Sequence, residues 1–169
     1  VNISLISVSR RLIRLFEARS PMPHVRLRTV RTLVDAGLNA GVLVAPILPG
    51  ISDSPSSLRR LLEAAKAHGA RFAHVSPLRL YPAVGPVLLP IVEQHFPALA
   101  ARYRSVYRGD GHAPARYAAA LRARFAKIAE ELGVPIHGEP DEDPRWAGPE
   151  QLALFGERRD EETDTHSLR

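Results

Sequence analysis

The sequence predicts an α/β fold built on a short parallel sheet. Three apolar segments, near residues 1–7, 40–45 and 71–76, have the length and composition of strands. Apolar residues at helical spacing fill the stretches between them, and units of roughly 30 to 40 residues are typical of right-handed β/α crossovers. After the third strand the pattern becomes entirely helical, and the last part of the chain is rich in Pro, Gly, Asp and Glu. We therefore expect three parallel strands with crossover helices, a helical segment and a disordered acidic tail.

The first unit combines a strand with a capped helix. Val1, Ile3 and Leu5 alternate with other side chains, which indicates a strand with at least one buried face. Ser9 stands just before an apolar stripe at helical spacing that ends at Phe16, so we expect Ser9 to cap that helix. A strand thus passes to a helix within two residues.

The second unit contains the most apolar strand. A helical stripe from Leu27 to Val34 ends at Gly37, and residues 40–45 form a continuous apolar run, which is typical of a parallel strand covered on both faces. Residues 46–53 form a loop whose prolines and glycine should stop further strand pairing.

The remaining elements follow from the same patterns. We expect a helix from Pro55 to Gly69, the third strand, and then three helices over residues 84–96, 97–107 and 114–132. These elements divide the chain into three expected parts. Residues 1–82 form the β/α part, residues 83–137 form a helical extension packed on it, and residues 138–169 form a disordered tail.

Composition limits the functions that the chain can have. It contains no cysteine, so it cannot supply thiolate ligands to a cluster, and its seven histidines are scattered without i, i+4 pairing. The longest uncharged stretch, residues 36–52, is too short to span a membrane, and no export signal is visible. We therefore expect a cytoplasmic protein without a membrane partner.

Charge divides the chain into a basic body and an acidic tail. Residues 1–136 hold 19 basic and 8 acidic side chains, whereas residues 137–169 hold 4 and 10. A basic body attracts phosphates, which makes nucleic acid one expected partner. The alternative is a solvated surface, because 21 of the 23 basic residues are arginine and GC-rich coding also favours arginine.

Several ordered motifs resemble those of one enzyme superfamily. They are Val-Asn-Ile-Ser-Leu-Ile-Ser at residues 1–7, Phe-Glu-Ala-Arg-Ser-Pro at 16–21, and Val-Leu-Val-Ala-Pro-Ile-Leu-Pro-Gly-Ile-Ser-Asp at 42–53. Leu-Arg-Leu at 78–80 and His-Phe-Pro at 95–97 continue the series. Over roughly residues 1–133 the chain resembles the radical S-adenosylmethionine superfamily, in its spore photoproduct lyase-like or DNA repair photolyase-like branch.

The resemblance implies a partial (β/α) barrel that holds S-adenosylmethionine and a [4Fe-4S] cluster. The three cluster cysteines of the family, spaced C-x3-C-x2-C near the first strand, are absent from this chain. We therefore expect the chain to be the carboxyl-terminal half of such an enzyme, with the cluster held by a segment that this chain lacks. The cofactor would supply the difficult chemistry, and this half would supply contacts to cofactor and substrate.

The resemblance also implies cofactor-binding residues at the strand ends. Ser4 or Ser7 would bond the ribose of S-adenosylmethionine, although Ser4 could equally be structural. Pro46 and Ile47 would form an apolar wall and offer a free carbonyl to the adenine, and the alternative is a plain strand-ending turn. Arg79 would face the cofactor carboxylate or a substrate phosphate, or else be solvated.

Other polar residues have structural interpretations. We expect Asp53 to cap the helix that follows it and Glu17 to pair with Arg26. Tyrosines and arginines alternate between residues 102 and 124, which suits nucleic-acid binding by stacking and charge. Tyrosines on amphipathic helices are, however, more often half-buried at the edge of a core.

The tail carries a second, unrelated signal. Gln151, Leu152, Leu154 and Phe155 belong to a Gln-Leu-Ala-Leu-Phe segment that closely resembles the pentapeptide with which bacterial repair and replication proteins bind the sliding clamp. This motif supports an alternative function, a non-catalytic DNA-repair-associated interaction protein that docks to a clamp through its tail. A helical turn folded back onto the domain is the structural alternative.

Overall fold

The computed structural model of the chain describes residues 1–109 and 111–136. These described residues belong to one compact unit. The elements follow one another in this order: β1 (Asn2–Ser4), α1 (Arg10–Phe16), α2 (Pro23–Asp35), β2 (Gly41–Ile47), α3 (Pro55–Ala67), β3 (Ala73–Pro77), α4 (Gly85–His95), α5 (Pro97–Val106) and α6 (Ala115–Leu132).

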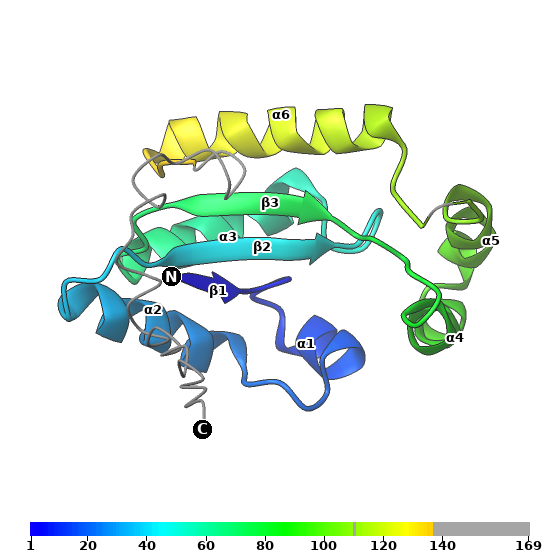
Figure 1. Ribbon diagram of the computed structural model, residues 1–169, viewed down its shortest axis with the longest axis horizontal. Helices are drawn as coiled ribbons and strands as arrows, with labels where there is room; N and C mark the ends of the chain where they lie inside the picture. The colour runs from blue at the N-terminus through cyan, green and yellow to red at the C-terminus, as the bar shows by residue number, and fades with distance from the viewer. Residues whose placement is uncertain (110, 137–169) are drawn as a thin grey trace, which may run out of the picture. The chain divides into compact units, whose positions relative to one another are not determined.

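The three strands form one parallel sheet in the order β1-β2-β3, as the sequence predicts (Figure 1). Val42 of the central strand pairs with Ile3 on one side and with Ala73 on the other. The next residue, Leu43, lies between Ser4 and His74. Side chains at paired positions of neighbouring strands point to the same face. The register therefore places Ser4, Leu43 and His74 together on one face of the sheet.

Three strand boundaries differ from the expectation, and one of them is the start of β3, which begins at Ala73 rather than at residue 71. β1 ends at Ser4 rather than at residue 7, although the Leu5 N–H still donates to the Leu43 carbonyl at 2.8 Å. β2 continues to Ile47, beyond the proline that we expected to end pairing. An irregularity between Val44 and Ile47 resolves this conflict, because the pairing resumes at Ile47 without needing an N–H from Pro46.

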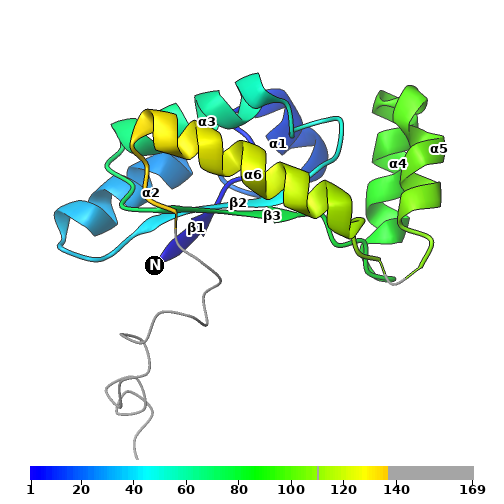
Figure 2. The same cartoon turned by 90° about the horizontal axis from the view of Figure 1, so that it is seen from above.

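The helices α1, α2, α3 and α6 lie on one side of the sheet, and Figure 2 shows this arrangement in a view along the sheet. Val42 and Val44 point into this layer and are fully buried in a core that also contains Leu61 and Phe125. The opposite face carries the exposed Asn2 and Ser4 and the partly buried Leu43. Among the residues that the structure describes, no helix covers this second face.

The local signals of the helices explain their ends. Ser9 caps α1 by accepting from the Leu12 N–H at 3.4 Å, as expected. Ser54 caps α3 and Pro55 occupies its first turn. Gly133, with a φ of 63°, ends α6 in the left-handed conformation that glycine adopts most easily.

Helices α4 and α5 lie beyond the carboxyl ends of the strands (Figure 1). They enclose a second apolar cluster with Leu48, Leu78 and Leu80, and the stacked rings of Phe16 and Phe96 join α1 to this cluster. The expected helical extension is therefore divided between two places. Helix α6 packs on α3 and β3 as part of the main core, and only α4 and α5 extend beyond the sheet.

Two further findings concern membranes and the tail. No helix within residues 1–109 and 111–136 is long and apolar enough to cross a membrane. The expected disordered tail and its Gln151–Phe155 segment lie outside the residues that the structure describes.

Candidate functional site: the carboxyl edge of the sheet

The carboxyl ends of the three strands meet at one edge of the sheet, where α/β proteins usually place their chemistry. The loop after β2 is held in place at this edge by its own polar groups. The Ser52 hydroxyl accepts from the Leu48 N–H at 3.0 Å, and Ser52 itself is buried. Gly50 adopts a φ of +76°, which allows the loop to turn back sharply.

Asp53 fixes this loop to α6 instead of capping α3. Its Oδ1 accepts from the Gly50 N–H at 2.9 Å, and its Oδ2 accepts from the Tyr117 hydroxyl at 3.0 Å. The Asp53 carbonyl also accepts from Arg124 at 3.1 Å. The expected capping role of Asp53 is therefore wrong, because the neighbouring Ser54 takes the cap and frees the carboxylate for longer-range partners.

The two expected serines lie in different environments. Ser4 is exposed on the uncovered face of the sheet, and its carbonyl accepts from Arg26 at 2.9 Å. Ser7 is 6% exposed, and its hydroxyl accepts from the Ser9 N–H at 3.0 Å, which shapes the turn into α1. The structure thus leaves the Ser4 side chain accessible to a ligand and gives the Ser7 hydroxyl a structural partner.

Pro46 and Ile47 also differ in their exposure to solvent. Pro46 is exposed, whereas Ile47 is 0% exposed and lies in the main core. The Ile47 carbonyl accepts from the Leu78 N–H at 2.9 Å. The expectation of an apolar wall and a free carbonyl at Ile47 is therefore corrected, because both groups serve the packing between β2 and the chain after β3.

Arg79 is exposed in the segment after β3, and its backbone forms an isolated bridge with that of His112.

Arg26 has the structural role that we expected. It is 8% exposed, pairs with Glu17, and donates to the carbonyl of Pro21 at 3.0 Å. Since Arg26 also holds the Ser4 carbonyl, it fixes α2 to the end of β1.

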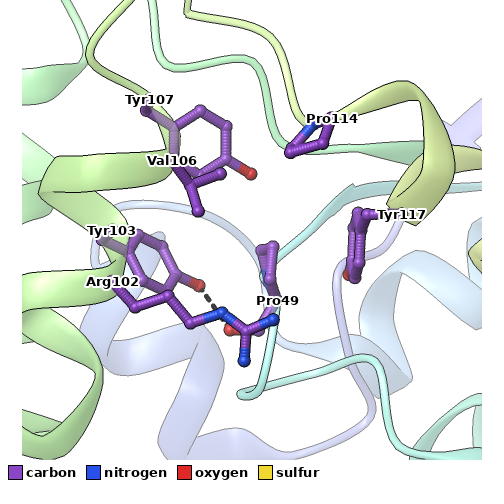
Figure 3. Close-up of a pocket in the computed structure, with 7 residues that line it drawn as sticks. All are labelled: Pro49, Arg102, Tyr103, Val106, Tyr107, Pro114 and Tyr117. Carbon is purple, nitrogen blue, oxygen red and sulfur yellow. Dashed lines mark hydrogen bonds between the residues drawn. The ribbon is translucent and has the colours of Figure 1, made fainter.

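A pocket that the sequence analysis did not identify as a unit lies between α5, the start of α6 and the loop after β2 (Figure 3). Its volume is about 40 Å³. Figure 3 shows the α5 side chains on one side of the pocket and Pro114 and Tyr117 on the other. The lining residues are Pro49, Arg102, Tyr103, Val106, Tyr107, Pro114 and Tyr117.

The hydroxyls of the three pocket tyrosines differ in their partners. Tyr103 donates to the Pro49 carbonyl at 2.9 Å, and Tyr117 donates to Asp53. The Tyr107 hydroxyl is buried and has no hydrogen-bond partner among residues 1–109 and 111–136. Because the rings of Tyr103 and Tyr107 are buried, the expected stacking of nucleobases on them is not available in this conformation, and the core-edge interpretation is correct for these two residues.

The electrostatics of the pocket keep these hydroxyls protonated. Burial, followed by the charge of Asp53, raises the pKa of Tyr107 to about 12. Burial also raises the pKa of Tyr103 and of Tyr117 well above 10, and the nearby Asp53 carboxylate adds to both shifts. All three hydroxyls therefore keep their protons at neutral pH, and the Tyr107 hydroxyl keeps an unused donor.

Within the described part of the chain, no three His, Cys, Asp or Glu side chains gather as a metal site would require. One exposed arginine, Arg102, lines the pocket, and others are adjacent in the sequence to its tyrosines. Arg102, Arg108 and Arg116 are all exposed, while Arg104 pairs with Glu93 at 2.5 Å. The carboxyl edge of the sheet thus combines a fixed loop, a small pocket with an unused donor, and free positive charge.

Comparisons with known proteins give relatives without an assigned activity. An uncharacterized protein of Mycobacterium bovis and two of Mycobacterium tuberculosis are each 34% identical to this chain over 157 residues. The similarity covers 92% of this chain but 46% of each relative, so the chain spans about half the length of the curated relatives that it matches. No family model matches the chain, and no solved structure matches it.

Proposed function

We infer that this chain is the carboxyl-terminal portion of a radical S-adenosylmethionine enzyme. It contributes contacts to the cofactor and to the substrate for reductive cleavage of S-adenosylmethionine and the radical chemistry that follows, with nucleic acid as the substrate class. The observation that carries the proposal is the uncovered polar face of the three-stranded parallel sheet.

Parallel sheets are almost always covered on both faces. Here the helices cover one face, and among the described residues β1 pairs only with β2. Further β/α units added beside β1 would extend the sheet and turn its polar face into the interior of a partial barrel. The greater length of the mycobacterial relatives supports this reading, as does the resemblance of the 42–53 loop to that of the superfamily.

The residues of this chain do not fit an iron–sulfur cluster. The chain has no cysteine. Cluster iron in this superfamily requires thiolate ligands. We therefore assign the cluster to another segment and derive no step through it.

S-adenosylmethionine fits better, because Ser4 offers an exposed hydroxyl on the uncovered face and Pro46 an exposed apolar ring at the carboxyl edge. When bound, this cofactor supplies the carbon–sulfur bond that is broken. Ser4 would hydrogen-bond and orient it, and Arg26 would keep Ser4 in place through its carbonyl.

The test uses a longer M. tuberculosis relative, purified without oxygen and reconstituted with iron and sulfide. With dithionite and S-adenosylmethionine it should produce 5′-deoxyadenosine, measured by mass spectrometry. The present chain, treated in the same way, should bind no cluster and form no product. A relative that takes up no iron or forms no 5′-deoxyadenosine contradicts the proposal, as does a stoichiometric cluster in the present chain.

The clamp-docking alternative rests on Gln151–Phe155, which lies outside the described residues, and it stays a prediction of the sequence. It is compatible with the enzyme proposal, because a short tail motif can recruit an enzyme as well as a non-catalytic protein.

A further inference from the structure

The hydroxyl of Tyr107 is the least satisfied polar group in the described part of the chain. Tyr107 is 7% exposed, and its hydroxyl oxygen is buried without a partner. Native proteins rarely leave a buried hydroxyl unpaired unless a water molecule, an ion or a ligand meets it. Figure 3 places this hydroxyl toward the space between α5 and Pro114, so its unused bond is directed into the pocket.

The polar side chains of the pocket that have no hydrogen-bond partner are those that can donate. Tyr103 and Tyr117 already donate to Pro49 and Asp53, and both carboxylate oxygens of Asp53 already accept. The guanidinium of Arg102 forms no hydrogen bond or ion pair among the described residues. A group that complements Tyr107 and Arg102 must therefore offer acceptors and carry negative charge.

The size of the pocket limits what enters it. A volume of about 40 Å³ holds two or three water molecules, and it is far smaller than the cavity of roughly 150 Å³ that accepts a benzene ring. One oxyanion group can enter, while the remainder of the ligand stays outside against the surface of α5 and α6.

Charge favours a singly charged phosphate. The basic excess of residues 1–136 attracts polyanions, and it includes the exposed Arg108 and Arg116, which follow Tyr107 and precede Tyr117 in the sequence. Asp53 lies close enough to influence the tyrosines and would repel a dianion more than a monoanion. A phosphodiester carries one negative charge, whereas inorganic phosphate and phosphate monoesters approach two at neutral pH.

We propose that this pocket binds a backbone phosphodiester of a nucleic-acid strand, with the Tyr107 hydroxyl donating to one phosphate oxygen and Arg102 pairing with the group at the pocket mouth. The contact is independent of base sequence, because it reads only the backbone. This contact would hold the substrate of the proposed function. Only the biological role of the contact depends on that function, whereas the binding itself does not. Its test uses neither cofactor nor cluster, so the two can fail separately.

The test is fluorescence anisotropy of a labelled ten-nucleotide oligothymidylate titrated with the complete chain. Tyr107→Phe removes only the hydroxyl, and it should weaken binding about tenfold, as expected for a hydrogen bond to a charged group. Because no counterion is released by a neutral hydroxyl, the salt dependence should stay unchanged. Arg102→Gln should weaken binding similarly and lower the slope of log affinity against log salt by about 0.7.

Matched controls exclude general effects. Tyr81→Phe changes an exposed tyrosine outside the pocket, and Arg28→Gln removes a positive charge on α2, so both should stay within about twofold of the unmodified chain. The thermal midpoint of Tyr107→Phe should be retained or raised, which separates lost binding from lost folding.

Three outcomes overturn the assignment. Unchanged binding in both pocket variants means that only water meets Tyr107. Equal losses in the pocket variants and the controls mean that the surface attracts DNA without a site. If thymidine 5′-monophosphate binds as tightly as the oligonucleotide, the ligand is a free nucleotide and the assignment to a strand is wrong.

Discussion

Replacing Asp53 with alanine tests how the loop after β2 is held against α6. The substitution removes the acceptors of the Gly50 N–H, at 2.9 Å, and of the Tyr117 hydroxyl, at 3.0 Å. A hydrogen bond to a charged group contributes about 1.5 to 3 kcal/mol. Since Asp53 and Tyr117 are only partly buried, the lower end applies, and the free energy of unfolding should fall by about 2 to 3 kcal/mol.

Urea unfolding followed by circular dichroism measures this loss. With a slope of about 2 kcal/mol per molar urea, the midpoint should move down by about 1 to 1.5 M. Tyr117→Phe alone should cost about 1 kcal/mol, and the double variant should cost less than the sum of the two, because both changes remove the same bond. Glu63→Ala, which removes an exposed carboxylate from α3, should change the free energy by less than about 0.5 kcal/mol. If Asp53→Ala is as stable as this control, Asp53 does not hold the loop.

Three further predictions concern the sheet, the pocket and the tail. Gly41→Ala should lower the free energy of unfolding by about 1 to 3 kcal/mol, because its new methyl group would lie 2.3 Å from the Phe72 carbonyl oxygen, whereas Gly85→Ala, with open space around it, should change little. Burial raises the pKa of Tyr107 to about 12, whereas an exposed tyrosine titrates near 10, so proton loss in the unfolded chain lowers the stability of the fold as the pH rises from about 10 toward 12. The urea midpoint should fall over this range, and it should fall less in Tyr107→Phe. A labelled peptide containing Gln151–Phe155 should bind a bacterial sliding clamp with micromolar affinity, or about −8 kcal/mol, and should lose this binding when its last two residues are alanine; equal binding of the two peptides would mean that the motif is not used.

Local patterns were sufficient to predict most of the fold. The alternation of residues 1–5 and the apolar segments near 40–45 and 71–76 identified the three strands, because each strand buries at least the face that packs on the helices. Ser9 was predictable as a cap because a helix N-terminus needs an acceptor within three residues. The pairing of Glu17 with Arg26 was likewise visible across a short connection between two helices.

The site was harder to predict, because it depends on contacts between distant parts of the chain. Asp53 and Ser54 are both good caps, and the choice between them follows from Tyr117, which is 64 residues away. Ile47 follows a proline in what the sequence presents as a loop, and its pairing with Pro77 and its carbonyl bond to the Leu78 N–H show that it still belongs to the sheet. The unpaired hydroxyl of Tyr107 has no local signature, since Tyr103, Tyr107 and Tyr117 have similar neighbours in the sequence.

Hydrogen–deuterium exchange of a reconstituted M. tuberculosis relative, with and without S-adenosylmethionine, most directly tests whether this half of the protein contacts the cofactor. We expect slower exchange with cofactor in the peptides that align with residues 2–7 and 44–53, and no change in those that align with the outer helix at 55–67. Bound cofactor without protection of the first two segments, or no binding in equilibrium dialysis, would contradict it.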